Sequence, residues 1–213
     1  MVRLIMLAEN DHVEEVVSPR QLQDSLIDLV EEECSYDKAY WMPLLLSAII
    51  ATLGLLTNSA AVVIGAMLIA PLFWPILGVT LGIITTKRKV LQRSVLFLLL
   101  SLISVLGISW LLTLVIPISD VTEEIRSRSN PTILDLIIAL ATSVIGILAV
   151  SYPKISKTIA GVAVSIALLP PLCTVGIGLA YGSWNIFSGA ALLFTANASA
   201  IIFTGIVTLY FMK

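Results

Sequence analysis

The residues that could do chemistry in this sequence are neutral: four prolines and a few amide and hydroxyl side chains within long apolar runs. A proline inside a helix removes one backbone N–H and leaves the carbonyl one turn earlier without its donor. In lipid, that carbonyl must find a protein or water partner. Freed carbonyls suit a monovalent cation, whereas N–H groups at the start of a half-helix suit an anion, and both readings stay open. The residues expected to line a solute or ion pathway are Asn58, Pro71, Trp74, Pro75, Pro170, Pro171, Thr174 and Asn197.

The same residues also have purely structural interpretations. Asn58 lies between two apolar runs, where asparagine commonly forms a turn. Asn197 is flanked by small residues, so its amide could join two helices. The prolines could kink their helices for packing alone.

The prolines fall in two similar stretches, Ala66–Gly82 and Ile166–Gly182, one hundred positions apart. In this register Pro71 matches Pro171, and each stretch ends in a small-xxx-small pair that favours close helix packing. Paired, interrupted apolar segments point to a central site between two inverted repeats. Chance similarity between two stretches rich in Leu, Gly and Pro is the alternative. The glycines expected to pack helices are Gly78, Gly82, Gly178 and Gly182.

The elements that must position these residues are transmembrane helices. Hydrophobic residues make up 58% of the chain and charged residues 12%, with a mean hydropathy of +1.04. The apolar runs are continuous and about 20 residues long, as all-α membrane proteins require. We therefore expect a polytopic all-α protein with about six transmembrane helices, an inverted 3+3 repeat, and proline-broken second and fifth helices. The expected segments are 40–57, 60–85, 94–116, 132–150, 158–182 and 184–212 within a transmembrane domain at 38–213.

The register of the first hairpin has an alternative. Residues Trp41–Ala70 could form one long tilted helix, with Leu72–Thr86 as a short half-crossing after Pro71. The basic residues that follow end on the same side of the membrane in either version.

Residues 1–37 form a short N-terminal segment with one amphipathic helix. Ser18-Pro19 is typical of a helix start, and Leu22, Leu26 and Val30 recur at helical spacing. The opposite face is acidic, which does not favour an anionic lipid surface. We expect this helix to pack against a neighbouring subunit, to end a cytosolic domain, or to remain a solvated lead-in.

The distribution of basic residues predicts the orientation. Six crossings with both termini in the cytoplasm leave only Arg126 and Arg128 outside. The protein is therefore expected to be a multi-pass protein of the cell membrane. The basic residues that this arrangement places inside are Arg3, Arg20, Lys38, Lys87, Arg88, Lys89, Arg93, Lys154, Lys157 and Lys213.

Two stretches resemble a known family. The first, made of Ser47–Leu55, Asn58-Ser59, Val62–Pro71 and Pro75–Gly78, is similar to the DUF389 family of prokaryotic membrane proteins, as is the second, Ala167–Leu172. The resemblance covers about Tyr36–Tyr210. It implies a multi-helix prokaryotic membrane domain, often preceded by a soluble region, and it carries no catalytic or binding residue.

The sequence gives no indication of an enzyme. It has no Ser/His/Asp or Cys/His set, no zincin motif and no phosphate loop. Cys34 and Cys173 do not have metal-ligand spacing, and His12 is the single histidine, so no cofactor or metal is expected. The net charge of −2 does not suggest a nucleic-acid partner.

The pattern as a whole predicts a transporter or channel for a small solute or ion, with its site between the broken segments at Pro71/Pro75 and Pro170/Pro171. The alternative is a non-transporting scaffold or sensor that oligomerises and signals through its cytoplasmic segment. The glycine-bearing helix faces also predict a homo-oligomer in the lipid bilayer.

Overall fold

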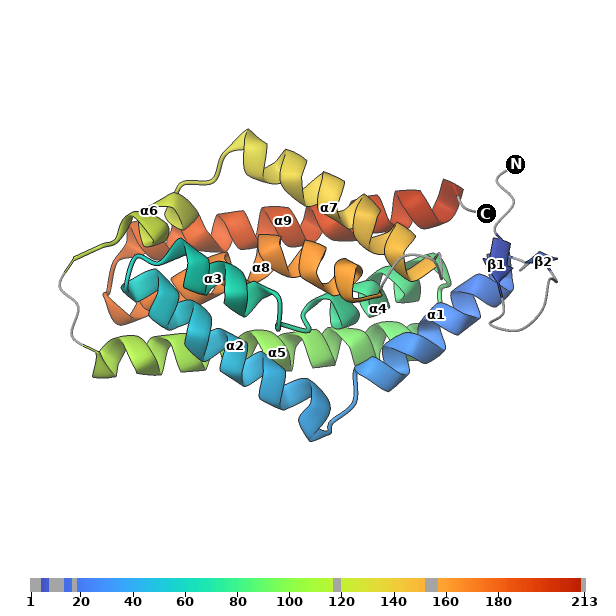
Figure 1. Ribbon diagram of the computed structural model, residues 1–213, viewed down its shortest axis with the longest axis horizontal. Coiled ribbons are helices and arrows are strands. Elements are labelled where there is room, and N and C mark those ends of the chain that lie inside the picture. The colour runs from blue at the N-terminus through green and yellow to red at the C-terminus, as the bar shows by residue number, and fades with distance from the viewer. Residues whose placement is uncertain (1–4, 8–13, 17–18, 117–119, 152–156, 212–213) are drawn as a thin grey trace.

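The computed structural model is an elongated, almost entirely helical molecule (Figure 1). Its backbone is described over residues 5–7, 14–16, 19–116, 120–151 and 157–211, and its side chains over 21–116, 120–151, 165 and 167–211. Five residues used above, Arg3, His12, Ser18, Lys154 and Lys213, lie outside the described residues.

The N-terminal part contains the only departure from the expected all-α class within the described chain. Strands β1 (Ile5–Leu7) and β2 (Glu14–Val16) form a two-stranded antiparallel ribbon in which Ile5 faces Val16. Everything after this ribbon in the described ranges is helix, turn or loop.

The amphipathic helix is α1 (Pro19–Glu33), and its apolar face is covered by the same chain. Leu22, Leu26 and Val30 are buried, and Val30 lies directly against Gly78 of α4 (Phe73–Ile84). The apolar face is therefore not solvated as a lead-in helix would be, whereas contact with a neighbouring subunit and the end of a cytosolic domain stay predictions. A helix this short is marginal alone, so packing on α4 supplies most of its stability.

The first membrane hairpin consists of α2 (Lys38–Leu56) and α3 (Ala60–Met67). Asp37 caps α2 by accepting a hydrogen bond from the Ala39 N–H at 2.8 Å. Between the helices, Asn58 has φ 55°, and the Ser59 N–H donates to the Gly54 carbonyl at 2.8 Å, which reverses the chain. The alternative of one long helix over Trp41–Ala70 is therefore wrong.

The remaining helices follow at short intervals. Residues 68–72 separate α3 from α4. The basic cluster of Lys87, Arg88, Lys89 and Arg93 falls at the start of α5 (Arg88–Val115), although the sequence placed it before that helix. The remaining helices are α5 (Arg88–Val115), α6 (Glu123–Ser129), α7 (Ile133–Ser151), α8 (Lys157–Ala180) and α9 (Trp184–Phe211).

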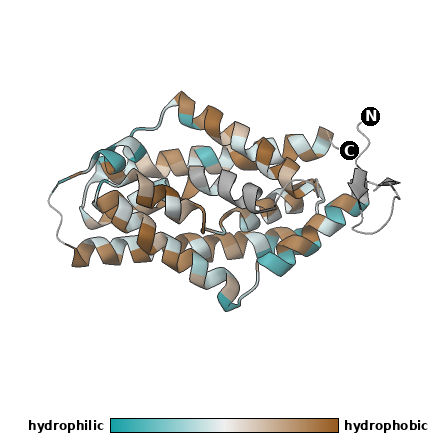
Figure 2. Cartoon of the chain, in the orientation of Figure 1, coloured by the Kyte–Doolittle hydropathy of each residue, from teal (hydrophilic) through white to brown (hydrophobic). Residues whose placement is uncertain are grey.

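Four of these helices, α2, α5, α7 and α9, are long and apolar enough to cross a membrane. Apolar residues run along much of their length (Figure 2), and their outward faces carry exposed large hydrophobic side chains such as Ile103 and Phe203. In contrast, the ranges 72–82 of α4 and 167–178 of α8 are buried throughout. The architecture is therefore that of a membrane protein in which two proline-containing segments form the centre.

The helix pairs α5/α9 and α2/α7 match in length and burial. α5 and α9 both have 28 residues and begin 96 positions apart; α2 and α7 both have 19 and begin 95 apart. Every buried position of α7 has a buried counterpart in α2 at that offset. Every buried position of α5 likewise matches one in α9, in the pairs Val90/Ile186, Ser94/Ala190, Phe97/Leu193, Ser101/Asn197, Val105/Ile201, Ser109/Gly205 and Thr113/Leu209.

This offset corrects the register read from the sequence. An offset of 96 pairs Pro75 with Pro171 and Gly82 with Gly178, whereas the offset of one hundred pairs Pro71 with Pro171. The ends and buried positions of α5 and α9 follow the offset of 96 and those of α2 and α7 follow an offset of 95, so neither pair follows the offset of one hundred.

The turn between α4 and α5 gives a stability prediction. Thr86 has φ 55°, and the equivalent turn between α8 and α9 places Gly182 at φ 62°. Because a β-branched residue is strained in this conformation, Thr86→Gly is expected to raise the free energy of unfolding by about 0.5–1 kcal/mol. The measurement is the thermal midpoint in detergent. Thr85→Gly is the control and is expected to lower it, since Thr85 has φ −90°; a lower midpoint for Thr86→Gly contradicts the turn geometry.

Candidate functional site

The second predicted segment is broken in the middle. α3 ends at Met67 and α4 begins at Phe73, so Pro71 lies between two helices and Pro75 lies in the first turn of α4. A proline disfavours helix at the residue before it but is tolerated in a first turn, which explains both positions. The Ala70 carbonyl has no helical donor at hand and accepts a hydrogen bond from Ser165 Oγ of α8 at 2.6 Å. This contact ties the break directly to α8.

The fifth predicted segment is not broken, which corrects the sequence expectation. α8 is continuous from Lys157 to Ala180, with Pro170 and Pro171 in its interior. Pro171 leaves the Ala167 carbonyl without its helical donor, and Asn197 of α9 supplies one: its Nδ2 donates to Ala167 O at 2.9 Å. A hydrogen bond from a neighbouring helix therefore stands in for the missing backbone N–H.

Asn197 is the most unusual polar residue of this core. Its side chain is 4% exposed, and its Oδ1 atom has no hydrogen-bond partner among the described residues. Leaving a buried amide oxygen unpaired costs about 1–3 kcal/mol. Such an atom needs a functional or structural explanation.

The other predicted pathway residues divide into two groups. Thr174 is fully buried, and its hydroxyl donates to the Pro170 carbonyl at 2.9 Å. Trp74 is also buried, with its ring 5.2 Å from that of Phe73. Asn58, in contrast, is exposed at the α2–α3 turn, where its Oδ1 accepts the Glu124 N–H at 3.1 Å. Asn58 therefore belongs to a turn beside α6 and not to the core.

The predicted packing glycines lie at helix contacts in three of four cases. A Cβ on Gly78 would meet Ser94 Oγ, one on Gly82 would lie 2.7 Å from Leu91 Cα, and one on Gly178 would lie 2.6 Å from Phe187 N. Gly182 has nothing within 4 Å of a built Cβ and has φ 62°. The packing role expected for Gly182 is therefore wrong, because this residue closes the α8–α9 turn.

A second polar cluster was missed by the sequence analysis. Thr52 Oγ1 lies 2.8 Å from Ser109 Oγ, and Cys173 Sγ approaches the Ala48 carbonyl at 4.0 Å. The cluster joins α2, α5 and α8. A signal was present in the sequence, because Ser94, Ser101 and Ser109 recur every seven or eight residues and so occupy one face of α5.

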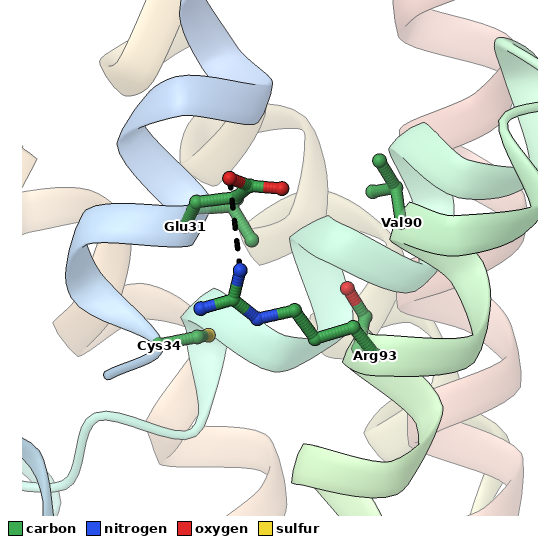
Figure 3. A pocket seen from close by; sticks show the side chains of 6 residues that line it. Glu31, Cys34, Val90 and Arg93 are labelled. Atoms are coloured by element: carbon green, nitrogen blue, oxygen red, sulfur yellow. Dashed lines mark ion pairs between the residues drawn. The ribbon is translucent and has the colours of Figure 1, made fainter. Parts of the chain in front are cut away.

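The basic cluster of Lys87, Arg88, Lys89 and Arg93 meets the acidic face of α1. Lys87 Nζ lies 2.6 Å from Asp24 Oδ1, and Arg93 lies 3.6 Å from Glu31. Figure 3 shows Arg93 reaching from α5 towards Glu31, next to Cys34. The cavity there is about 10 Å³, which leaves room for one water at most.

The opposite end of the bundle carries a larger, open recess. Its volume is about 260 Å³, and it lies between α6 and the α8–α9 turn. Arg126 lines it and is paired with Glu123 at 3.5 Å. The other lining residues are Val121, Ser129, Asn130, Ser183, Asn185 and Ile186.

Comparison with known proteins identifies the family. The sequence profile described as "Domain of unknown function (DUF389)" matches residues 67–203, which is more than half of the chain. The chain belongs to the DUF389 family. An uncharacterized protein of Methanocaldococcus jannaschii is 32% identical over 188 residues, which cover 88% of this DUF389 chain and 58% of the relative. The chain thus spans little more than half of that relative. No solved structure matches.

The resemblance stated from the sequence is thereby confirmed. The DUF389 match includes the break, α4, the proline-containing part of α8, and Asn197. The break, the buried prolines and Asn197 therefore lie within the residues that match the family.

Proposed function

We propose that this protein is a transporter or channel for a small solute or ion, with its site where the α3–α4 break meets α8 and α9. The observation that carries the proposal is Asn197, a buried amide with an unpaired oxygen beside proline-freed backbone. Irregular backbone at membrane depth is tolerated where it is buried in protein or lines a water-filled cavity. In transporters, discontinuous helices form the substrate site.

Internal two-fold packing supports the same proposal. A Cβ on Gly205 of α9 would meet Thr80 of α4, and a Cβ on Gly176 of α8 would meet Ser109 of α5. Thr80 and Gly176 are 96 positions apart, and so are Ser109 and Gly205, so each contact is the counterpart of the other in the two halves of the chain. We infer an inverted repeat of two three-helix units, in which α2, α3–α4 and α5 correspond to α7, α8 and α9. With α3–α4 and α8 counted, the chain makes six crossings.

The orientation is part of the proposal. The N-terminal end of α1 and the C-terminal end of α9 lie at the same end of the bundle as the α4–α5 turn (Figure 1). Lys87, Arg88 and Lys89 lie at that turn, whereas Arg126 and Arg128 lie in α6 at the other end. We propose that the protein lies in the cell membrane. By the positive-inside rule, both termini then lie in the cytoplasm.

The test is side-specific labelling of single cysteines in proteoliposomes, in a variant lacking Cys34 and Cys173. Ala70→Cys and Thr174→Cys probe the break, exposed Asn58→Cys is the positive control, and fully buried Phe97→Cys is the negative control. We expect a charged thiosulfonate reagent to modify the two break positions at least tenfold faster than Phe97→Cys. Modification should also reduce the flux of a permeant solute.

The scaffold alternative predicts a different result. If the helices serve only as an anchor, the break positions stay as unreactive as Phe97→Cys while Asn58→Cys is labelled. That outcome, with no flux above empty vesicles for a panel of small ions and neutral solutes, contradicts a pathway through the break.

A further inference from the structure

We infer that the junction of α4, α8 and α9 binds a monovalent cation, with Asn197 Oδ1 and backbone carbonyl oxygens as its ligands. This inference rests on the proposed function and names the class of ion. The sequence alone left an anion and a cation equally open. An anion needs hydrogen-bond donors and a cation needs oxygen acceptors, so the donors and acceptors of the junction decide between the two.

The junction has more acceptors than donors. Pro71, Pro75, Pro170 and Pro171 each contribute a carbonyl and no N–H. At the start of α4, where an anion would need free N–H groups, Pro75 has none and the Trp74 N–H already donates to Pro71 O at 3.3 Å. An anion therefore finds few donors here.

Each side-chain donor group of the junction already makes a hydrogen bond, and only one N–H of the Asn197 amide lacks an acceptor among the described residues. Ser165 Oγ donates to Ala70 O at 2.6 Å, Thr174 Oγ1 to Pro170 O at 2.9 Å, and Asn197 Nδ2 to Ala167 O at 2.9 Å. Each of these bonds goes to a backbone carbonyl. The polar atom left over is an acceptor, Asn197 Oδ1.

These contacts place the break and Asn197 against the same turn of α8. Ser165 and Ala167 lie on one turn of α8; the first contacts the break and the second contacts Asn197. Between them, the Ile166 carbonyl has lost its helical donor, because residue 170 is a proline. The Ile166 carbonyl therefore lies on the turn of α8 that contacts both the break and Asn197, which makes it the backbone oxygen expected to share the ion with Asn197 Oδ1.

The absence of charge in these segments selects a monovalent ion. Ranges 68–84, 167–180 and 184–211 contain no Asp, Glu, Lys or Arg in the sequence. Ca²⁺ is held mainly by carboxylates, and Mg²⁺ keeps several waters around one or two carboxylates. Neutral amide and carbonyl oxygens replace the hydration shell of a monovalent cation, as in ion-channel filters.

The first test is binding of ²²Na⁺ to the purified wild-type protein in detergent. We expect saturable binding that excess unlabelled NaCl displaces and that choline chloride at equal ionic strength does not. Binding no greater than that of a protein-free control overturns the inference, and this result needs no variant.

The second test assigns the site by thermal unfolding. Replacing choline chloride by NaCl at constant chloride is expected to raise the midpoint of the wild type by about 3–6 °C when Na⁺ is near ten times its dissociation constant. Asn197→Leu is expected to lose this response. The matched control is Ser101→Ala, at the buried α5 position equivalent to Asn197, whose hydroxyl already donates to Phe97 O.

A response that persists unchanged in Asn197→Leu places the ion elsewhere and overturns the assignment. If Asn197→Leu does not fold, Asn197→Asp takes its place, because an added carboxylate keeps an oxygen ligand and should increase ²²Na⁺ affinity at pH 8. An unchanged or lower affinity of Asn197→Asp contradicts direct ligation.

The two proposals fail separately. Na⁺ binding without flux of any solute contradicts transport and leaves the cation site in place. Flux of a solute without Na⁺ binding, Na⁺ dependence or Na⁺ permeation contradicts the cation site and leaves the pathway in place.

Discussion

Gly178→Ala is expected to lower the free energy of unfolding by about 3 kcal/mol, the upper end of the usual cost of overpacking. The added Cβ would lie 2.6 Å from Phe187 N and 2.9 Å from its Cα. Backbone atoms cannot rotate away as a flexible side chain can. The helices also cannot separate easily, because the Ser183 N–H donates to Gly178 O at 3.0 Å and closes the turn between them.

The matched control for this substitution is Gly107→Ala. A Cβ at Gly107, in the middle of α5, meets nothing within 4 Å, so alanine should keep or raise stability by up to about 1 kcal/mol. We expect Gly178→Ala to lose about 6–12 °C in thermal midpoint and much of its monodisperse peak in size-exclusion chromatography. Equal shifts in the two variants would mean that α8 and α9 are not in backbone contact at this point.

Gly82→Ala extends the test to the proposed repeat. Gly82 occupies the equivalent place in α4, where an added Cβ would lie 2.7 Å from Leu91 Cα. Its loss of stability should therefore be close to that of Gly178→Ala. A Gly82→Ala protein as stable as the wild type contradicts equivalent packing in the two halves.

The sequence predicted the four long apolar helices α2, α5, α7 and α9 because each lies in a continuous apolar run. Pro71 also marked the break correctly, since proline stops the preceding residues from continuing a helix. The same reasoning failed for α8, although it has two adjacent prolines. α8 stays helical through both prolines, and the Ala167 carbonyl that Pro171 frees accepts a hydrogen bond from Asn197, thirty positions later; such a contact depends on tertiary packing.

The repeat register failed for a related reason. Matching Pro71 to Pro171 compares residue types, whereas the helices of the structure correspond in which of their positions are buried. Ser101 and Asn197 differ in type but occupy equivalent buried positions of α5 and α9. A serine and an asparagine give no obvious sequence match. The helical period of the buried positions along α5 and α9 carries the correct offset, and it becomes visible only when burial is known.

The α1 interface gives a prediction about thiol chemistry. Cys34 lies after the end of α1, 3% exposed, in the small cavity beside Arg93. Burial raises the pKa of its thiol from 9.0 to about 12, while the Arg93 charge lowers it and Glu33 raises it further. The buried neutral thiol therefore contributes stability that is fully present below pH 9 and is lost between about pH 9 and 12.

Alkylation of Cys34 by iodoacetamide at pH 8 is accordingly expected to be slow, because only the thiolate reacts. A thiol with a pKa of about 12 is ionised about a thousandfold less at pH 8 than one at 9.0. A carboxylate at position 30 cannot be buried against Gly78, so Val30→Asp should detach α1 from α4 and expose Cys34. The rate of Cys34 alkylation should then rise by up to about a thousandfold. Ser25→Asp adds the same charge on the exposed side of α1 and should leave the rate unchanged.

Arg93→Gln separates the effect of the Arg93 charge on the thiol pKa from the effect of the Glu31–Arg93 pair on the position of α1. The rate of alkylation at Cys34 alone is measured by mass spectrometry of the labelled peptide. Removing the cation raises the pKa of the thiol further, so labelling should become slower. If the Glu31–Arg93 pair instead served mainly to hold α1 closed, its loss would expose Cys34 and labelling would become faster. An exposed pair of this kind contributes little to stability, about 0–1 kcal/mol, so we expect the slower rate. A faster rate in Arg93→Gln, with Val30→Asp no faster than the wild type, would contradict apolar packing on α4 as the force that holds α1 in place.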